Sequence, residues 1–212
     1  MNVRLIAHTS NSDFLVGQAA AICTAATDWD KARKHALESG HESVAEHAVF
    51  TFRIEGVSRA LLAQLTRHRI ASFSVKSQRY VDMGDMPYVL PPSITADADM
   101  MDYYGYIMSH IQNFYSLATK RGIPKEDARY ITPQAACTDL IVTMNARELR
   151  HFFTLRCCNR AQWEIRQMAD EMLMLCKAAA PMLFADAGPG CVRGKCPEKR
   201  PCGKPRTHMG VV

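Results

Sequence analysis

The 212-residue sequence contains neither a long apolar run nor a glycine-rich nucleotide loop. No stretch approaches the roughly 20 apolar residues that a membrane-spanning helix needs. The N-terminus also lacks the basic and apolar segments of a signal peptide. Without a Gly-x-Gly-x-x-Gly sequence, the chain does not carry the common dinucleotide-binding fingerprint. We therefore expect a cytoplasmic protein with no membrane partner.

The cysteine pattern is not that of a disulfide framework. Five cysteines lie in the body of the chain and three near its end: Cys23, Cys137, Cys157, Cys158 and Cys176, then Cys191, Cys196 and Cys202. The body cysteines occur in apolar settings, where a small buried thiol is the ordinary explanation, and we expect a reduced compartment. The last three lack Cys-x-x-Cys spacing, so zinc would require a fourth ligand such as His208 or a cysteine of another chain. We predict no metal.

The net charge of +5 is concentrated at the C-terminal end. Residues 188–212 contain six basic residues and one acidic residue, which leaves 20 basic and 20 acidic residues in 1–187. Gly, Pro, Cys and basic residues replace the apolar periodicity after residue 187. We expect a folded body of residues 1–187 and a loop-type tail of residues 188–212, either a surface clamp or a flexible segment.

Apolar periodicity predicts a single-domain α+β fold with a mainly antiparallel sheet. A chain of this length with 48% hydrophobic residues can form one full core. Period-two alternation predicts strands over 3–7, 48–55 and 138–144. Helical spacing predicts helices over 12–22, 28–39, 57–68, 97–121, 124–129, 146–155 and 161–180. Ser12 and Asn145 are expected to cap two of these helices.

Residues 67–80 concentrate groups that can hold an anion. Arg67-His68-Arg69 follows the predicted helix, and Ser72, Ser77, Gln78 and Arg79 add donors within a few residues. Arginine forks and hydroxyls together form phosphate sites, and a bound dianion would relieve repulsion between the guanidinium groups. The alternative is a structural role, because basic residues commonly cap the last turn of a helix.

Three ordered blocks together resemble the flavin-dependent thymidylate synthases. The first block is Gly-His-Glu-Ser-Val-Ala-Glu-His at residues 40–47, and the second is the basic stretch of residues 67–80. The third contains Asn145-Ala146-Arg147, Leu155-Arg156 and Ala161-Gln162-Trp163-Glu164. Three blocks in the same order over residues 40–164 are far more specific than one short motif.

The resemblance implies an enzyme that converts dUMP to dTMP. It implies 5,10-methylenetetrahydrofolate as the one-carbon donor and FAD, reduced by NADPH, as the hydride source, without an enzyme nucleophile. It also implies a homotetramer with its sites between subunits, and residues 1–187 would be the catalytic domain. Nothing else in the sequence argues for NADPH. We expect no nucleic-acid partner.

The resemblance assigns roles residue by residue. The catalytic residues would be Arg156, which would stabilise an anionic uracil, and His41, which would face the flavin. The dUMP residues would be Gln64, Arg67, Ser77, Gln78, Arg79, Arg129 and Arg156. The FAD residues would be Ser43, Arg67, His68, Arg69, Asn145, Arg147 and His151. Cys157 and Cys158 receive no catalytic role.

Some of these residues also have simpler explanations. Ser43 and Glu46 fit a capping box, and a histidine at a helix entrance, such as His41, is commonly structural. Arg129 could pair with Glu126 at helical spacing, which is worth about 0.5 kcal/mol. The family commonly has Asn-Glu where this chain has Ser74-Val75, and asparagine where it has His151. These departures put the ligand role of Val75 in doubt, whereas an imidazole at position 151 can still make one hydrogen bond.

Two other functions fit the same residues. A nucleic-acid-binding module could place Arg67, Arg69, Lys76 and Arg79 on phosphates and stack bases on Phe73 and Tyr80. The neutral charge of residues 1–187 argues against it. The third reading is a structural interaction protein whose tail is clipped by a metal.

Overall fold

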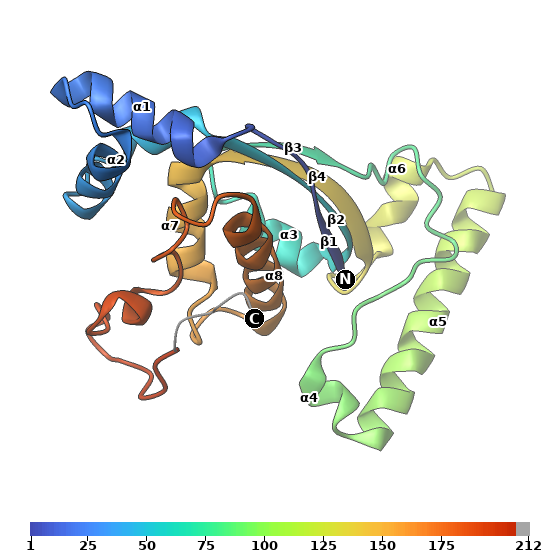
Figure 1. Ribbon diagram of the computed structural model, residues 1–212. Helices are drawn as coiled ribbons and strands as arrows, with labels where there is room; N and C mark the ends of the chain where they lie inside the picture. The colour runs from blue at the N-terminus through green and yellow to red at the C-terminus, as the bar shows by residue number, and fades with distance from the viewer. Residues whose placement is uncertain (207–212) are drawn as a thin grey trace.

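The computed structural model describes residues 1–206 and contains one four-stranded antiparallel sheet. The strands are β1 (Asn2–His8), β2 (Val49–Ser58), β3 (Ala71–Val75) and β4 (Cys137–Asn145). Their order is β1-β2-β4-β3, with every neighbouring pair antiparallel. Figure 1 shows the sheet curving over α3, α7 and α8. The prediction of a single-domain α+β fold is confirmed.

The helices form a layer under the sheet and two extensions at its ends. Their bounds are α1 (Ser12–Thr24), α2 (Trp29–Glu38), α3 (Arg59–Leu65), α4 (Pro92–Thr95), α5 (Ala98–Lys120), α6 (Lys125–Ala128), α7 (Ala146–Arg156) and α8 (Trp163–Ala179). Short 3-10 helices are η1 (Glu42–His47), η2 (Arg129–Ile131) and η3 (Gly190–Arg193). In Figure 1, α1 and α2 lie at one end, and α4 with α5 forms an arm at the other. None of the helices in residues 1–206 combines the length and apolar character that a bilayer crossing requires.

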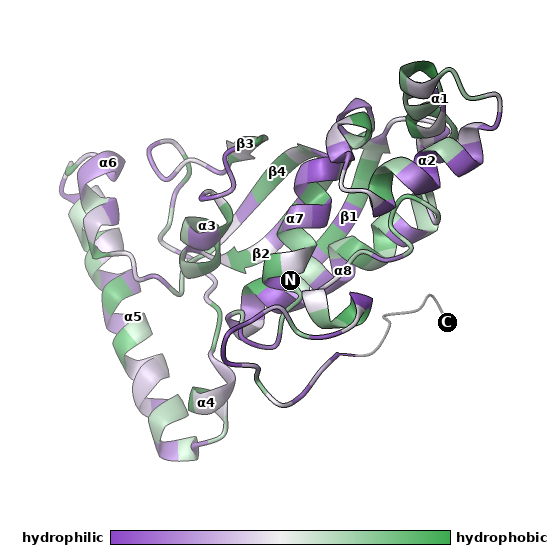
Figure 2. Ribbon diagram, turned by 90° about the vertical axis from the view of Figure 1, so that its left-hand side faces the viewer, coloured by the Kyte–Doolittle hydropathy of each residue, from purple (hydrophilic) through white to green (hydrophobic). Residues whose placement is uncertain are grey.

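Alternating apolar residues of the central strands form the core. Phe50, Phe52 and Ile54 of β2 are fully buried, and Val142 of β4 lies beside them in the sheet. Figure 2 shows the hydrophobic strand residues where α7 and α8 cross the sheet. The period-two prediction for these two strands is confirmed, because one face is covered by helices and the other is not.

The helix predicted over residues 57–68 is shorter than expected. Gly56 has φ of 68°, and the register of β2 on β4 shifts between Ile54 and Val57, so the strand continues to Ser58. The Ser58 hydroxyl then accepts a hydrogen bond from the Leu61 amide and caps α3. Because α3 ends at Leu65, the basic triplet Arg67-His68-Arg69 follows the helix and is not its last turn.

Two predicted helix starts are also wrong in detail. Asn11, in a left-handed conformation, precedes α1, whereas Ser12 is the first helical residue and donates to the Thr9 carbonyl. Ser43 lies inside η1, which has no side-chain cap bond, and the Glu46 carboxylate pairs with Arg147. The expected capping box therefore does not form. The predicted cap at Asn145 does form, through the Glu148 amide at 2.9 Å.

A second, smaller core fixes the long helix α5. Met108, Tyr115 and Ala118 of this helix pack with Met83 and Met86 from the preceding loop. The helix prediction for residues 97–121 is confirmed, but only part of its apolar side is buried. Large apolar side chains remain exposed along the helix: Met100, Met101, Tyr103, Tyr106, Ile107, Phe114 and Leu117.

Candidate functional site

A hydrogen-bonded chain of Glu148, His68 and Arg156 forms the centre of the site. His68 is only 6% exposed and Glu148 only 7%. Nδ1 of His68 lies 2.8 Å from Oε1 of Glu148, and Nε of Arg156 lies 3.1 Å from Nε2 of His68. Glu148 and Arg156 stand two turns apart on α7, so they lie on the same face of that helix. The imidazole after α3 fits between them.

The partners of His68 define its protonation state. Arginine can only donate, so Nε2 of His68 must accept, and Nδ1–H must donate to Glu148. Burial lowers the pKa of His68; the Glu148 hydrogen bond opposes this effect, and the Arg156 charge adds to it. We conclude that His68 is a neutral imidazole whose two nitrogens are both used. These contacts orient Arg156, and the role of His68 as an FAD ligand stays a prediction.

Arg156 lies near the guanidinium of Arg67, and neither group has a carboxylate partner in the described chain. Burial and the nearby Arg67 charge lower the pKa of Arg156. Its remaining hydrogen bond goes to the Gln64 backbone carbonyl at 3.4 Å. Within residues 1–206, neither Arg67 nor Arg156 forms an ion pair. An uncompensated pair of guanidinium groups favours an anionic ligand.

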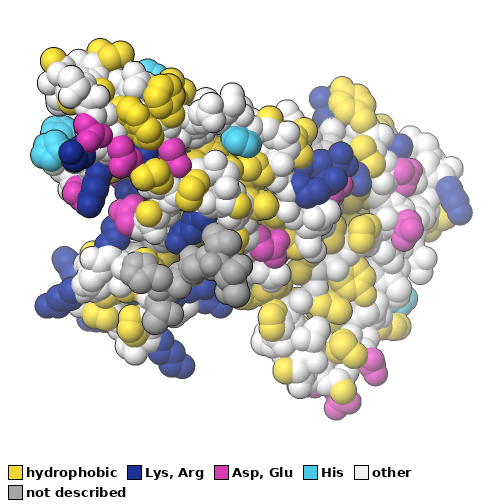
Figure 3. Space-filling view, viewed as in Figure 1, with side chains coloured by type: hydrophobic (Ala, Val, Ile, Leu, Met, Phe, Trp, Pro, Cys, Tyr) yellow, Lys and Arg dark blue, Asp and Glu magenta, His cyan; other side chains and the backbone are white. Residues whose placement is uncertain are grey.

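A second basic group lies at the opposite end of α3, near α6. Burial and the Arg129 charge lower the pKa of Arg59. Arg129 donates to the backbone carbonyl of Glu126, whereas the Glu126 carboxylate pairs with Arg79 at 2.9 Å. The expected alternative, a side-chain pair between Arg129 and Glu126, is therefore not formed. Figure 3 shows Lys and Arg side chains gathered near α6.

The strand β3, which the sequence analysis did not predict, runs between the two basic groups. Ala71, Phe73 and Val75 face the core, and Ser72 and Ser74 are exposed. Alternation in this segment was the available signal. Because Val75 packs on the core, it does not replace the acidic ligand that the family commonly has at this position.

Two further predicted dUMP residues, Ser77 and Gln78, follow β3, whereas Gln64 lies in α3. The Ser77 hydroxyl accepts the Arg79 amide at 3.2 Å, and Gln78, which is buried, donates to the Thr132 hydroxyl at 3.4 Å. The Gln64 amide donates to the Ala60 carbonyl. The bonds of Ser77 and Gln78 fix the shape of the loop near Arg79.

None of the five main cavities found in residues 1–206 is lined by both basic groups. Arg156 lines a hollow of about 320 Å³ with Cys158 and tail residues, and neither Arg67 nor Arg129 lines that hollow. Arg67 follows the C-terminal end of α3, whereas Arg59 opens the helix, which is roughly 10 Å long. The chain thus brings Arg67 to Arg156 near the C-terminal end of α3, and Arg59 to Arg129 near its N-terminal end.

The residues predicted for FAD are spread over η1 and the start of α7. His41 and Ser43 line a hollow of about 890 Å³ that α1 and α2 also border. Arg147 is half exposed and pairs with Glu46, so it ties α7 to η1. His151 is exposed, with its ring centre 6.2 Å from that of His68. The side-chain Oδ1 of Asn145 accepts the Glu148 amide and caps α7, so the side-chain Nδ2 is its donor to a ligand.

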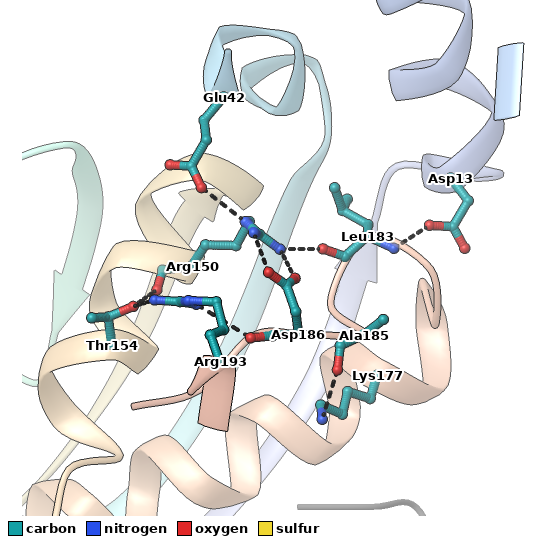
Figure 4. A network of polar contacts seen from close by, with 9 residues as sticks. All are labelled: Asp13, Glu42, Arg150, Thr154, Lys177, Leu183, Ala185, Asp186 and Arg193. Atoms are coloured by element: carbon teal, nitrogen blue, oxygen red, sulfur yellow. Dashed lines mark hydrogen bonds and ion pairs between the residues drawn. The ribbon is translucent and has the colours of Figure 1, made fainter. Parts of the chain in front are cut away.

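Arg150, which the sequence analysis missed, holds η1 in place. Figure 4 shows its guanidinium between Glu42 and Asp186, and it also donates to the Leu183 carbonyl at 2.8 Å. Burial lowers the pKa of Arg150, but Asp186 and Glu42 outweigh that effect and raise it overall. A permanent cation thus fixes the segment that carries His41. Its place among the apolar residues Leu149, Phe152 and Phe153 of α7 was the available signal.

Glu164 is the second missed residue. It is 2% exposed, and its carboxylate accepts the Ser58 amide at 2.7 Å and the Ser58 hydroxyl. This contact joins the N-terminal ends of α3 and α8 beneath the sheet. Only its place in the third sequence block indicated its importance.

Comparisons with known proteins agree on one family. The family described as "Thymidylate synthase complementing protein" matches residues 4–182. The flavin-dependent thymidylate synthase of Geobacter sulfurreducens is 48% identical over 219 residues, covering 96% of this chain and 94% of that protein. The one from Nitratidesulfovibrio vulgaris is 51% identical over 179 residues, covering 79% and 73%. A crystal structure of the Helicobacter pylori flavin-dependent thymidylate synthase, complexed with FAD and dUMP, matches with a TM-score of 0.71 and 27% identity, covering 89% of this chain and 100% of that one.

Proposed function

The chain belongs to the flavin-dependent thymidylate synthase family, and we propose that it converts dUMP to dTMP with FAD as its bound cofactor. The observation that carries this proposal is the uncompensated guanidinium pair of Arg67 and Arg156. A nucleotide monophosphate with a polarised uracil supplies the negative charge that this pair lacks. The Helicobacter pylori relative, whose structure contains FAD and dUMP, supports the choice of ligands.

The residues around this pair fit a flavin dinucleotide. FAD carries a diphosphate, and Arg67 and Arg69 are exposed cations without carboxylate partners in the described chain. His151 adds an exposed imidazole near His68. When bound, FAD would supply the hydride that reduces the transferred one-carbon unit to methyl. We propose 5,10-methylenetetrahydrofolate as the carbon donor and NADPH as the reductant.

Arg156 would act on the uracil ring by holding charge. C5 of uracil becomes nucleophilic when electron density moves into the ring, and a guanidinium beside the carbonyl oxygens and N3 stabilises the anion that results. Arginine stays protonated near neutral pH and so contributes as a fixed cation. His68 accepts from Nε and the Gln64 carbonyl accepts from Nη2, which leaves Nη1 of Arg156 to face the ligand. We propose that His41 contacts the flavin from η1.

A reaction without an enzyme nucleophile is consistent with the thiols near the site. Burial, and then Asp170, raises the pKa of Cys157, and burial followed by Glu164 raises the pKa of Cys137. Both groups are therefore neutral thiols at physiological pH and poor nucleophiles. We propose that activation of C5 depends on Arg156 and not on a covalent adduct at C6.

The exposed apolar face of α5 supports assembly into a homotetramer. Tyr106, Ile107, Phe114 and Ile131 line a groove of about 340 Å³ on this arm. Contiguous exposed apolar surface of this kind is typical of a subunit interface. We propose that assembly brings Arg129 of one subunit to Arg67 and Arg156 of another and so completes the dUMP site. Residues 1–187 would form this catalytic unit.

The colour and turnover of purified protein test the proposal together. The protein should be yellow, release FAD on denaturation, lose its colour under NADPH without oxygen, and form dTMP from dUMP and 5,10-methylenetetrahydrofolate. Colourless protein that binds RNA with an affinity that falls steeply with salt would contradict the proposal and favour a nucleic-acid-binding module.

A further inference from the structure

Four cysteines from two distant segments line one cavity beside the end of α7. Cys158 lies between α7 and α8, whereas Cys191, Cys196 and Cys202 come from the tail. The cavity has a volume of about 290 Å³, and all four side chains are free thiols. The three tail cysteines alone cannot complete a tetrahedral site, and His208 lies outside the described residues. The fold supplies the fourth sulfur through Cys158.

Several hydrogen bonds hold the tail against this loop. Asn159 donates to the Lys204 carbonyl at 2.7 Å, and Arg160 donates to the Arg200 carbonyl at 2.9 Å. Arg206 donates to the Cys157 carbonyl at 2.7 Å and pairs with Asp170 at 2.8 Å. Residues 200–206 are therefore fixed over Cys158. These hydrogen bonds and this ion pair keep the tail cysteines at the same cavity as Cys158.

The charges around the cavity suit a negatively charged metal complex. The complex of one Zn²⁺ ion with four thiolates has a net charge of −2. Four cations line the cavity against a single carboxylate: Arg160, Lys195, Lys204 and Arg206, with Glu198. The Arg206 amide also points at Cys191 Sγ, at 3.4 Å. A backbone N–H at the sulfur and nearby cations would balance the negative charge of a bound zinc–thiolate complex.

We propose that Cys158, Cys191, Cys196 and Cys202 bind one structural Zn²⁺. Four thiolates in a tetrahedron are a closed zinc site, and Cys191-x4-Cys196 falls within the usual ligand spacing. On binding, each thiol loses its proton to solvent and each sulfur forms one bond to zinc, with no change of oxidation state. Within residues 1–206 no three His, Cys, Asp or Glu side chains already converge closely enough to hold an ion, so binding tightens the tail around the metal.

The neighbouring Cys157 provides an internal contrast. It is fully buried, and burial together with Asp170 raises its pKa, so it remains a neutral thiol in the core. Adjacent side chains in the chain point in different directions, and only Cys158 reaches the cavity. Cys158, Cys191 and Cys196 also border the hollow that Arg156 lines. The metal would therefore form a rigid wall beside the candidate catalytic arginine.

Metal analysis of the purified full-length protein tests this proposal independently of thymidylate synthesis. Protein prepared under reducing conditions, without a metal-affinity tag, should contain one zinc per chain by mass spectrometry. Cys158→Ser, Cys191→Ser, Cys196→Ser and Cys202→Ser should each lower the zinc content at least tenfold, whereas Cys157→Ala and Cys23→Ser should retain it. Absence of zinc, or full zinc content in Cys158→Ser, would overturn the proposal. Iron in place of zinc would overturn the choice of metal.

A measurement on the intact wild-type protein covers the case in which a variant does not fold. Titration with a mercurial reagent should release zinc in step with the loss of four thiols. Replacement of zinc by Co²⁺ should produce the intense visible absorption of a tetrahedral thiolate complex. Zinc that a weak chelator removes without any thiol modification would show an adventitious ion and contradict the site.

Discussion

A guanidinium group has donors but no acceptor, so its neighbours decide which ligand it can bind. Arg156 meets a neutral imidazole and a backbone carbonyl, and the nearby Arg67 charge acts on it. Both protein partners orient the side chain without neutralising it. The positive charge therefore remains available to a substrate. The planar fork of arginine can serve these two protein partners and a ligand at once, which a lysine ammonium cannot do with the same fixed geometry.

Replacing Arg156 by lysine should therefore stop catalysis while the flavin remains bound. Lysine keeps the charge but cannot reach both His68 and a uracil oxygen with fixed geometry. We expect kcat to fall by ~100-fold or more, as for loss of one oxyanion donor. Arg53→Lys, on an exposed face of β2, is the control. Turnover within twofold of the wild type in Arg156→Lys would refute the assignment.

Variants of His68 separate orientation from charge. Glutamine can donate to Glu148 and accept from Arg156, whereas phenylalanine can do neither. We expect His68→Phe to lower kcat by ~10- to 100-fold and His68→Gln to recover much of that loss. Equal damage in both variants would point to packing against Phe152, whose ring lies 4.9 Å from that of His68.

The lowered pKa of His68 predicts how stability depends on pH. The unfolded chain takes up a proton near pH 6.5, whereas folded His68 resists protonation until a lower pH. The unfolded state therefore binds more protons in that window, and the free energy of unfolding should fall as pH decreases below about 6.5. Urea titrations between pH 7.5 and 5.5 should show a shallower decline in His68→Gln. Parallel curves would contradict a neutral, buried His68.

Among single residues, the sequence analysis identified those with a distinctive chemistry and missed those that act through burial. Arg67 and Arg156 stand in recognisable blocks, and the structure brings them together. Glu164 and Arg150 are charged residues whose importance depends on partners more than 30 positions away. No local pattern reveals such a pair, because a charged residue in a helix is usually solvent exposed.

At the level of elements, α3 and α8 are held at their N-terminal ends by one carboxylate. Glu164 accepts both the amide and the hydroxyl of Ser58, which also caps α3. The position of α3 in turn sets where Arg67 and His68 emerge from the helix end. The candidate site therefore depends on the buried contact between Ser58 and Glu164.

Removal of this contact should destabilise the whole fold. Glu164→Ala leaves two buried donors of Ser58 without a partner, and we expect a loss of about 2–4 kcal/mol in the free energy of unfolding. Glu171→Ala, further along α8, should change stability by less than about 0.5 kcal/mol. Urea denaturation of both variants makes the comparison. Equal losses would show that helix propensity, and not the Ser58 contact, determines the effect.

Helices and strands with a regular spacing of apolar residues were predictable from the sequence. Elements whose bounds depend on a bulge or a tight turn were not. β2 and β4 alternate cleanly, and α5, α7 and α8 show helical spacing. The bulge at Gly56 moved the start of α3, and η1 adopted a 3-10 turn in place of a capped helix. β3 was overlooked because its five residues lie within a stretch interpreted as a ligand site.

At the scale of the whole molecule, the chain carries one basic group near each end of α3. It also carries the helix α5, whose large apolar side chains are partly exposed. The family resemblance names Arg67, Arg129 and Arg156 as residues of one site, whereas in the described chain Arg156 lies near Arg67 and Arg129 lies near Arg59. Which residues meet across subunits is a property of the assembly, and one sequence does not encode it in any local pattern. Likewise, no local pattern links Cys158 to the tail cysteines of the same cavity, which lie more than 30 residues away in the chain.

Mixed assemblies should reveal whether the site is shared. Arg129→Ala and Arg156→Ala are each expected to be nearly inactive alone. If the two arginines act from different subunits, co-refolded mixtures should regain activity at roughly a quarter of the sites, as random mixing gives. Mixtures of either variant with itself are the control. No recovery in mixed assemblies would place both residues in one subunit's site.

The most direct measurement of the central claim is a dUMP titration followed by the absorbance of the bound flavin. The account predicts a saturable change in the flavin spectrum of the wild-type protein. It also predicts that the midpoint moves to ~10- to 100-fold higher dUMP concentration in Arg67→Ala and Arg156→Ala, since each removes a charged hydrogen bond. A flavin spectrum that does not respond to dUMP, or the same midpoint in all three proteins, would contradict it.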